Sequence, residues 1–262
     1  MNAPGAGSAG GRLEVFALDG IPEVWPGDDL PALLVAALEA SVALPLREDD
    51  VLVVTQKIVS KAEGAIVDLT EIEPRPEAVE FAARWDRDAR QIEVVLRQAR
   101  RVLRMQNGVL ITETPHGFVC ANGGVDASNM GPESGNVATL LPADPDASAD
   151  HIRSAVREAL GVDVPVIVSD SFGRPWRWGI TDVAIGVSGM KPIDDLRGSP
   201  DADGRIMMST IRATADEIAT AAELAMGKTA RRPAALVRGA SPTRGEGRIA
   251  DCLIPPEFDL FR

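Results

Sequence analysis

The chain has 262 residues and a formal net charge of −12, with 45% hydrophobic and 25% charged residues. This composition predicts a folded globular protein with one large domain or two small ones. The acidic balance argues against nucleic acid and anionic membranes as partners, because both require a positive surface. No uncharged apolar run approaches about 18 residues, so no membrane span is expected.

The two cysteines, Cys120 and Cys252, are too few for a disulfide framework, which favours a cytoplasmic protein. Cys120 lies in the apolar run FVCANGG and reads as a small buried hydrophobe. The first residues lack a charged region followed by an apolar one, so residues 1–12 are expected to form a flexible tail rather than a signal peptide.

The first predicted strand covers residues 13–18, and a helix capped at Asp28-Asp29 follows over residues 30–44. A buried strand is predicted from Val51 to Thr55. We expect extended chain to continue beyond Thr55 and to end in another strand over residues 65–69.

The middle of the chain begins with a charged, helix-rich stretch from Glu77 to Met105. The Asn107-Gly108 turn introduces a predicted hairpin over residues 108–121, and VATLLP predicts another strand. The next helix is expected to start with Asp146 or Ser148 as its cap and to end at Gly161.

The last third contains predicted strands over residues 164–170, 181–189 and 234–239, and an alanine-rich helix that ends at Gly227. Strands and helices mix without a regular βαβ rhythm or an internal repeat. The predicted fold is therefore a single mixed α/β (α+β) domain over residues 13–239, followed by an irregular segment over residues 240–262. An inserted helical portion is expected near residues 76–105.

Asp170 follows the apolar strand VPVIV, at the start of the polar segment SDSFGRPWRWG. The carboxyl end of a buried strand often carries functional groups, because the strand fixes their position and the loop stays open to solvent. The Asp170 carboxylate and the Ser171 hydroxyl are oxygen donors that suit Mg²⁺ or Mn²⁺. Arg174 and Arg177 offer paired donors for phosphate or carboxylate. The structural alternative is a capping Asp beside an exposed Arg-rich turn.

A second polar segment, ANGGVDASNMG, contains Asp126. Its Asn-Gly-Gly run at residues 122–124 indicates a tight or left-handed turn. Asp126, Ser128 and Asn129 are short polar side chains that can coordinate a metal or hold phosphate oxygens through water. The alternative is a loop whose polar groups satisfy one another locally.

Lys57 and Lys61 follow the buried strand at residues 51–55 and could present ammonium groups to phosphates. The segment after this strand contains neither a G-x-x-x-x-G-K-[ST] motif nor a G-x-G-x-x-G motif, so a Walker P-loop and a dinucleotide-binding glycine loop are excluded there. Two solvated lysines on a turn are the alternative.

Two other segments carry weaker signals. The proline- and glycine-rich loop at residues 18–30 could wrap a planar base or could be an ordinary connection. On the helix at residues 213–228, Asp216, Thr220 and Glu223 share one face, which favours a solvated acidic stripe.

Seven longer motifs follow one another along the chain: IPEVWPGDDL, VLVVTQKIVSKAEGAIVDL, LITETPHGFVCANGGVDASN, LLPADPDASADHIR, SDSFGRPWRWGITDVAIGVSGM, ATADEIATAAELAMGK and ALVRG. This series closely resembles the coenzyme F-420-0:gamma-glutamyl ligase family, including the ligase half of its longer actinobacterial version. The resemblance covers roughly residues 13–239 and indicates the single-domain form, without a nitroreductase-like flavin-binding domain.

The resemblance implies a GTP-dependent amide ligase. Such an enzyme adds L-glutamate to the lactyl-phosphate-linked carboxylate of a deazaflavin precursor, coenzyme F-420-0, and extends the tail through gamma-glutamyl bonds. The resemblance also implies Mg²⁺ or Mn²⁺ as cofactor, sometimes aided by K⁺, and an intertwined homodimer with a fold of its own.

Position by position, the resemblance assigns metal binding to Asp126, Asp170 and Ser171, and catalysis to Asp126, Asp170 and Lys61. Contacts with GTP are assigned to Ile21, Pro22, Glu23, Val24, Gln56, Lys61, Asn129, Met226, Gly227 and Lys228. Some relatives have Gln at the position of Lys228, where a lysine would contact phosphate rather than a metal. Arg174 and Arg177 are assigned, as a hypothesis, to the glutamate carboxylates or the precursor phosphodiester.

Two rival functions would use the same residues. A metal-dependent nucleotide phosphohydrolase would release phosphate from GTP without glutamate. A non-catalytic module would bind deazaflavin or nucleotide without turnover, but a binding module has little need for two metal-binding carboxylates. The ligase remains the favoured prediction.

Overall fold

The computed structural model describes residues 11–128 and 135–260. Its centre is a five-stranded sheet in the order β1-β12-β2-β8-β9. The strands span Glu14–Ala17 (β1), Ala234–Arg238 (β12), Asp50–Thr55 (β2), Val166–Arg174 (β8) and Arg177–Ser188 (β9). Strands β2 and β8 are parallel, whereas each other neighbouring pair in this sheet is antiparallel.

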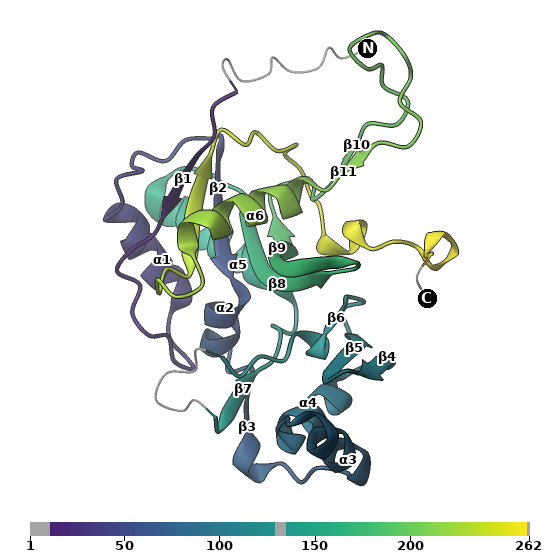
Figure 1. Ribbon diagram of the computed structural model, residues 1–262. Helices are drawn as coiled ribbons and strands as arrows, with labels where there is room; N and C mark the ends of the chain where they lie inside the picture. The colour runs from purple at the N-terminus through teal and green to yellow at the C-terminus, as the bar shows by residue number, and fades with distance from the viewer. Residues whose placement is uncertain (1–10, 129–134, 261–262) are drawn as a thin grey trace.

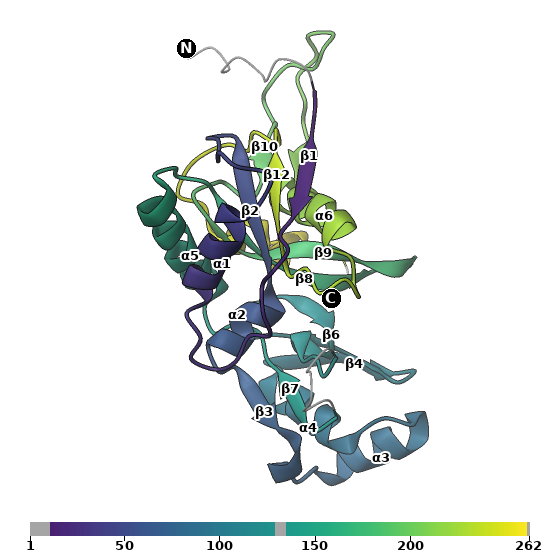
Figure 2. The same ribbon diagram turned by 90° about the vertical axis from the view of Figure 1, so that its left-hand side faces the viewer.

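Helices cover both faces of this sheet. Helices α1 (Leu30–Glu39) and α5 (Pro145–Leu160) lie on one side, and α6 (Thr214–Met226) lies on the other (Figures 1 and 2). The four residues 51–54 of β2 are fully buried, because a central strand has a packed layer on each face. This explains the continuous apolar run VLVV where a half-exposed strand would alternate.

A smaller portion of the chain lies below the sheet in Figure 2. It contains α3 (Pro76–Trp85), α4 (Ala89–Gln98), the pair β3 (Ile66–Asp68) and β7 (Val137–Thr139), and a sheet of β4 (Arg101–Gln106), β5 (Val109–Glu113) and β6 (Val119–Ala121). Phe81, Ile92 and Leu110 form a separate buried cluster there. Near the opposite end, β10 (Asp194–Asp195) pairs with β11 (Ile211–Arg212).

The mixed α/β class is therefore confirmed, as are most of the predicted elements. Asp29 caps α1 by accepting a hydrogen bond from the Ala32 amide at 3.1 Å. The predicted irregular segment contains two short 3-10 helices, Ile249–Cys252 and Pro256–Phe258, and an isolated bridge between Arg244 and Met190. None of the helices in the described ranges has the length and apolar character required to cross a bilayer.

The segment after β2 is a helix, α2 (Gln56–Ala62), so the prediction of continued extended chain is wrong. Ile58 and Val59 favour a strand by propensity, but both are buried on the inner face of this helix. The Ser60 hydroxyl adds a hydrogen bond to the Leu140 carbonyl at 2.6 Å. Tertiary packing therefore overrides local propensity.

Two further predictions are corrected at element boundaries. Arg101–Gln106 is a strand rather than the end of a helix, and it pairs with β5 across the Asn107-Gly108 turn, where both residues have positive φ. The cap of α5 is Asp144, which accepts from the Ala147 amide at 3.0 Å. Asp146 instead accepts from the Val187 amide at 2.7 Å and ties α5 to β9.

The segment SDSFGRPWR is not a loop. Strand β8 runs through it to Arg174 and pairs with β9, so that Asp170 lies opposite Val183 and the turn falls at Pro175-Trp176. The two strands extend beyond the rest of the sheet as a projecting hairpin (Figure 1). Pairing between the strands makes a rigid support for Asp170 where the sequence predicted an open loop.

Candidate active site

One edge of the central sheet gathers segments that are far apart in the sequence. In the parallel pair, Thr55 at the end of β2 lies opposite Ser169 in β8. The antiparallel neighbour β12 begins at the same edge, with Ala234 opposite Val54. The start of α2, the residue Asp170 and the segment before β12 therefore meet there.

A cavity of about 980 Å³ opens at this edge. Its lining includes all the described residues that the sequence assigned to metal, nucleotide or catalysis: Ile21, Pro22, Glu23, Val24, Gln56, Lys61, Asp126, Asp170, Ser171, Met226, Gly227 and Lys228. Asn129 lies outside the described residues. Arg174 and Arg177 do not line the cavity and lie farther out on the β8–β9 hairpin. We call this space the edge cavity.

Asp126 reaches the edge cavity from the smaller portion of the chain. Its backbone amide and carbonyl both bond to Thr139, at 3.0 and 2.8 Å, which fixes the segment against β7. Gly123 and Gly124 have positive φ, and a Cβ at Gly124 would come within 2.6 Å of the Leu141 side chain. The Asn-Gly-Gly run is therefore a requirement of the turn that delivers Asp126.

The Asp126 carboxylate accepts hydrogen bonds from the Lys57 ammonium and from the Ser128 amide and hydroxyl. Desolvation acts to raise the pKa of Asp126, but the hydrogen bond and charge of Lys57 and the bonds from Ser128 lower it more. The net pKa lies below the usual value, so this carboxylate is ionised at neutral pH.

Asp170 has the opposite electrostatic environment. Desolvation raises its pKa to about 7, and the negative charges of Asp126 and Asp182 add to this effect, against a hydrogen bond from the Ser171 amide. Burial likewise raises the pKa of the nearby Cys120 thiol to about 12, so this cysteine stays protonated and unreactive. A desolvated carboxylate beside two others is a position where a cation would be stabilised.

Lys228 lies between β8, β9 and α6. Its ammonium donates to Ser171 Oγ at 2.6 Å and to Asp182 Oδ1 at 2.7 Å. Desolvation acts to lower the pKa of Lys228, but Asp182 and Glu223 raise it more. The nearly buried Asp182 carboxylate therefore holds a charged ammonium at the cavity wall.

Lys61 reaches the edge cavity from α2, where it is almost fully buried and donates to the Glu23 carboxylate. The chain contains four lysines, and three of them line this one cavity: Lys57, Lys61 and Lys228. The acidic protein thus concentrates its ammonium groups where they face carboxylates and an open space. A phosphate-bearing ligand would complement this arrangement.

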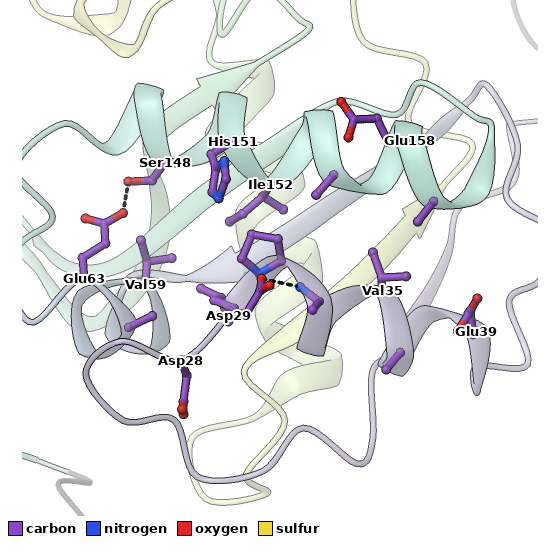
Figure 3. Close-up of a pocket in the computed structure, with 17 residues that line it drawn as sticks. Asp28, Asp29, Val35, Glu39, Val59, Glu63, Ser148, His151, Ile152 and Glu158 are labelled. Atoms are coloured by element: carbon purple, nitrogen blue, oxygen red, sulfur yellow. Dashed lines mark hydrogen bonds between the residues drawn. The ribbon is translucent and has the colours of Figure 1, made fainter.

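A second cavity, of about 790 Å³, lies between α1 and α5 and includes none of the predicted site residues. Figure 3 shows its apolar floor, with Val35, Val59 and Ile152, and acidic side chains around it. No lysine or arginine is among the residues that line it in the described part of the chain. We call it the α1–α5 groove.

Known proteins provide an independent comparison. A model of the family described as F420-0:Gamma-glutamyl ligase matches residues 20–239. The chain belongs to this family. A protein of Methanopyrus kandleri named coenzyme F420:L-glutamate ligase is 44% identical over 260 residues, which cover 96% of this chain and 100% of the relative.

Two other relatives have the same name and similar coverage. The Methanothermobacter thermautotrophicus protein is 41% identical over 253 residues, covering 95% of this chain and 99% of the relative. The Archaeoglobus fulgidus protein is 39% identical over 252 residues, covering 96% of this chain and 97% of the relative. This member of the F420-0:gamma-glutamyl ligase family therefore aligns with these relatives over nearly their whole length.

In this family member, the edge cavity includes three residues whose place there the sequence does not reveal. Asp182 is not among the predicted site residues, although a carboxylate inside the apolar strand TDVAIGVSG indicates a buried charge that needs a partner. For Lys57 the sequence leaves a phosphate-facing lysine and a solvated turn lysine as alternatives, and in the structure it donates to Asp126 and lines the cavity. Glu223 was placed on a solvated stripe, but it lines the cavity 3.4 Å from Lys228.

The rest of that predicted stripe also packs inward. Asp216 accepts from the Ala184 amide at 2.9 Å, and the Thr220 hydroxyl donates to the Asp182 carbonyl at 2.8 Å. The acidic face of α6 therefore attaches the helix to β9 and is not a solvated surface. It also holds the strand that carries Asp182.

Proposed function

We propose that the chain is a GTP-dependent ligase that adds L-glutamate to coenzyme F420-0 and extends a gamma-linked glutamate tail. The observation that carries this proposal is the convergence of two aspartates and three lysines on one cavity. Its volume of about 980 Å³ is large enough for a nucleotide and part of a second substrate. The printed names of the relatives support glutamate as the added group.

The nucleotide is proposed to lie between Ile21–Val24 and Met226–Lys228. The first segment gives apolar and backbone surface for a base, and the second follows the end of α6. Lys61 and Lys228 would then exchange their present carboxylate partners for phosphate oxygens. The burial of Lys61 makes its charge-assisted hydrogen bond stronger than one at an exposed position.

The donor set fits a hard divalent cation, Mg²⁺ or Mn²⁺. Asp126 and Asp170 supply carboxylate oxygens and Ser171 a hydroxyl, while water and nucleotide phosphates would complete the shell. Among the described residues no group of three or more His, Cys, Asp or Glu side chains is arranged to hold a metal. The proposed cation is therefore one whose ligands are shared between protein and nucleotide. The proposal includes K⁺ as an ion that assists the divalent cation.

In the proposed reaction, a carboxylate oxygen of coenzyme F420-0 attacks the gamma-phosphorus of GTP, and the bond to the beta-phosphate oxygen breaks. GDP leaves, and the product is an acyl phosphate. The amine of glutamate then attacks the acyl carbon, loses a proton and displaces inorganic phosphate. When bound, a divalent cation would neutralise phosphate charge during the first step.

The residues of the chain have distinct proposed roles in this reaction. Lys61 stabilises the charge that develops on the transferred phosphoryl group. Lys57 keeps Asp126 ionised and oriented toward the cavity. Asp182 holds Lys228 beside Ser171. In this proposal the residues align the gamma-phosphate of GTP with the precursor carboxylate, and none of them is assigned to activate a water molecule.

The test is incubation of the purified chain with coenzyme F420-0, GTP, Mn²⁺ and L-glutamate, followed by mass spectrometry. We expect a ladder of products separated by one glutamyl unit, with one GDP formed for each unit. Phosphate release from GTP at an equal rate without glutamate or precursor would instead identify a phosphohydrolase. Tight binding of both ligands with no product would identify a binding module.

The chain is also proposed to form a homodimer, as the family resemblance implies. Sedimentation velocity with and without GTP measures this directly. A single monomeric species over the concentration range in which the enzyme is active would contradict it.

A further inference from the structure

The tip of the β8–β9 hairpin exposes two tryptophans beside two arginines. Trp176 is 84% exposed and Trp178 is fully exposed. Large aromatic side chains are usually buried, where they contribute most to stability. An exposed aromatic pair on a paired, projecting hairpin indicates a binding surface.

The backbone of the tip is unfavourable for its residues. Trp176 has a φ of 56°, in the left-handed region, and it follows Pro175 in the turn. Glycine or asparagine is preferred at such a position, because a bulky side chain clashes there with its own backbone. The chain therefore carries a tryptophan where glycine would make a more stable turn, which points to a role in function.

An irregularity in the pairing positions the other tryptophan. The ladder passes from Gly173 opposite Ile180 directly to Arg174 opposite Arg177, which leaves Trp178 and Gly179 as extra residues in β9. Bulges of this kind occur beside active sites, where they redirect a side chain. The Arg174 guanidinium donates to the Trp178 carbonyl at 2.9 Å and fixes this bulge.

The tip is continuous with the edge cavity. Phe172, Gly173 and Ile180 line that cavity, and the tryptophans lie only about two residues beyond them, roughly 7 Å along a strand. Neither Arg174 nor Arg177 forms an ion pair with any described residue, so their charges stay available in a chain of net charge −12. The tip thus combines flat aromatic rings with uncompensated positive charge.

We propose that this tip binds the planar deazaflavin ring system of the precursor, with Trp178 and Trp176 stacking on the ring and the two arginines attracting the phosphodiester. This inference rests on the proposed function, in which the precursor carboxylate reacts with GTP inside the edge cavity. The carboxylate belongs to the lactyl-phosphate arm, so the ring must lie outside the reaction centre. The hairpin offers a surface of the required chemistry at the mouth of the edge cavity.

The test measures binding without turnover. The Kd of coenzyme F420-0 is determined by isothermal titration calorimetry, without GTP or glutamate, for wild type, W178A, W178F and W176G. We expect W178A and W176G each to raise this Kd on the order of tenfold relative to wild type. W178F should keep most of the wild-type affinity, since stacking needs an aromatic face. W85F changes a tryptophan at the end of α3 and is the matched control.

Further measurements separate substrate binding from a structural role. W176G should unfold at the same or a higher urea concentration than wild type, because glycine relieves the left-handed strain, while it still loses affinity. The Kd of GTP should not change in any variant. A phospholactyl compound without the deazaflavin ring should bind wild type and W178A equally.

Equal affinity of wild type, W178A and W176G for coenzyme F420-0 would overturn the proposal. It would also be overturned if W178A changed the sedimentation profile, which would make the tip a contact between two copies of the chain. The proposed ligase activity is tested separately. Tryptophan-dependent binding of coenzyme F420-0 with no glutamylation would refute that function and leave the ring-binding surface standing.

Discussion

The edge cavity and the α1–α5 groove have similar volumes, about 980 and 790 Å³, but they differ in what their charged groups do. In the groove, Asp29 caps α1 and Glu63 accepts from the Ser148 hydroxyl, so these carboxylates serve local structure. In the edge cavity, Asp126 is held by a lysine and Asp170 is desolvated beside other carboxylates. Charge organisation, rather than volume, therefore distinguishes the candidate active site.

The largest effect is expected when the aspartates of the edge cavity are neutralised. Asp170→Asn and Asp126→Asn should each reduce glutamate ligation by about 10²- to 10³-fold, because each removes charge that organises cations and phosphate. The assay is the rate of GDP formation that depends on glutamate. The matched change in the groove is Glu158→Gln, which should retain wild-type activity.

Circular dichroism and urea unfolding must show that the two Asp variants still fold. Ligation at the wild-type rate by a folded Asp170→Asn variant would remove the edge cavity as the reaction centre. A loss in Glu158→Gln equal to that in the aspartate variants would abolish the distinction between the two cavities.

A smaller loss is expected from Lys228→Met. This change leaves the nearly buried Asp182 carboxylate without its ammonium partner, and an unpaired buried charge costs about 1–3 kcal/mol of stability. Activity should fall about 10- to 100-fold, mainly through a higher KM for GTP. Lys191→Met is the control, because Lys191 is exposed and does not line the edge cavity. An unchanged KM for GTP would show that Lys228 is structural.

The sequence was informative about both the fold and the candidate site, but unequally. Capping at Asp29, the Asn107-Gly108 turn and the apolar run of β2 are local signals, and the structure contains all three features. Helix α2 was missed because its Ile58 and Val59 are buried by distant parts of the chain. Such burial has no local signature.

The same limit applies to the site residues. Asp126 and Asp170 stand out in glycine-rich polar segments, whereas Asp182 lies inside an apolar strand. Its role depends on the antiparallel register that puts Ser171 opposite it and on the approach of Lys228 from beyond α6. Register and tertiary approach require the whole fold, so Asp182 could be suspected from the sequence but not assigned.

The pH dependence of stability should reveal the desolvated carboxyl of Asp170, which lines the edge cavity and not the α1–α5 groove. Desolvation, with Asp126 and Asp182, raises the pKa of this carboxyl from 3.8 to about 7. Between about pH 4 and pH 7 the native state therefore keeps a proton that the unfolded chain has lost, so the free energy of unfolding falls as pH rises and levels off above pH 7. The fall should be about 1–2 kcal/mol after allowance for partial solvent access.

Urea unfolding in the presence of a chelator measures this component, and Asp170→Asn is the control because it cannot titrate. Between about pH 4 and pH 7, the unfolding free energy of wild type should fall relative to that of Asp170→Asn. Parallel curves for the two proteins would show that Asp170 is solvated like an ordinary surface carboxylate.

The smallest effect is expected in the α1–α5 groove itself. His151→Ala and Ala155→Leu alter its lining without touching the pairs that hold the edge cavity together, so the rate and KM of ligation should change less than about twofold. Ala155→Leu partly fills the groove, which makes it the stronger test of the two. If filling the groove raised the KM for a substrate, the groove would have to hold part of that substrate, although it lacks the opposed charges found at the edge cavity. Steady-state kinetics with each of GTP, glutamate and coenzyme F420-0 varied in turn would identify which one.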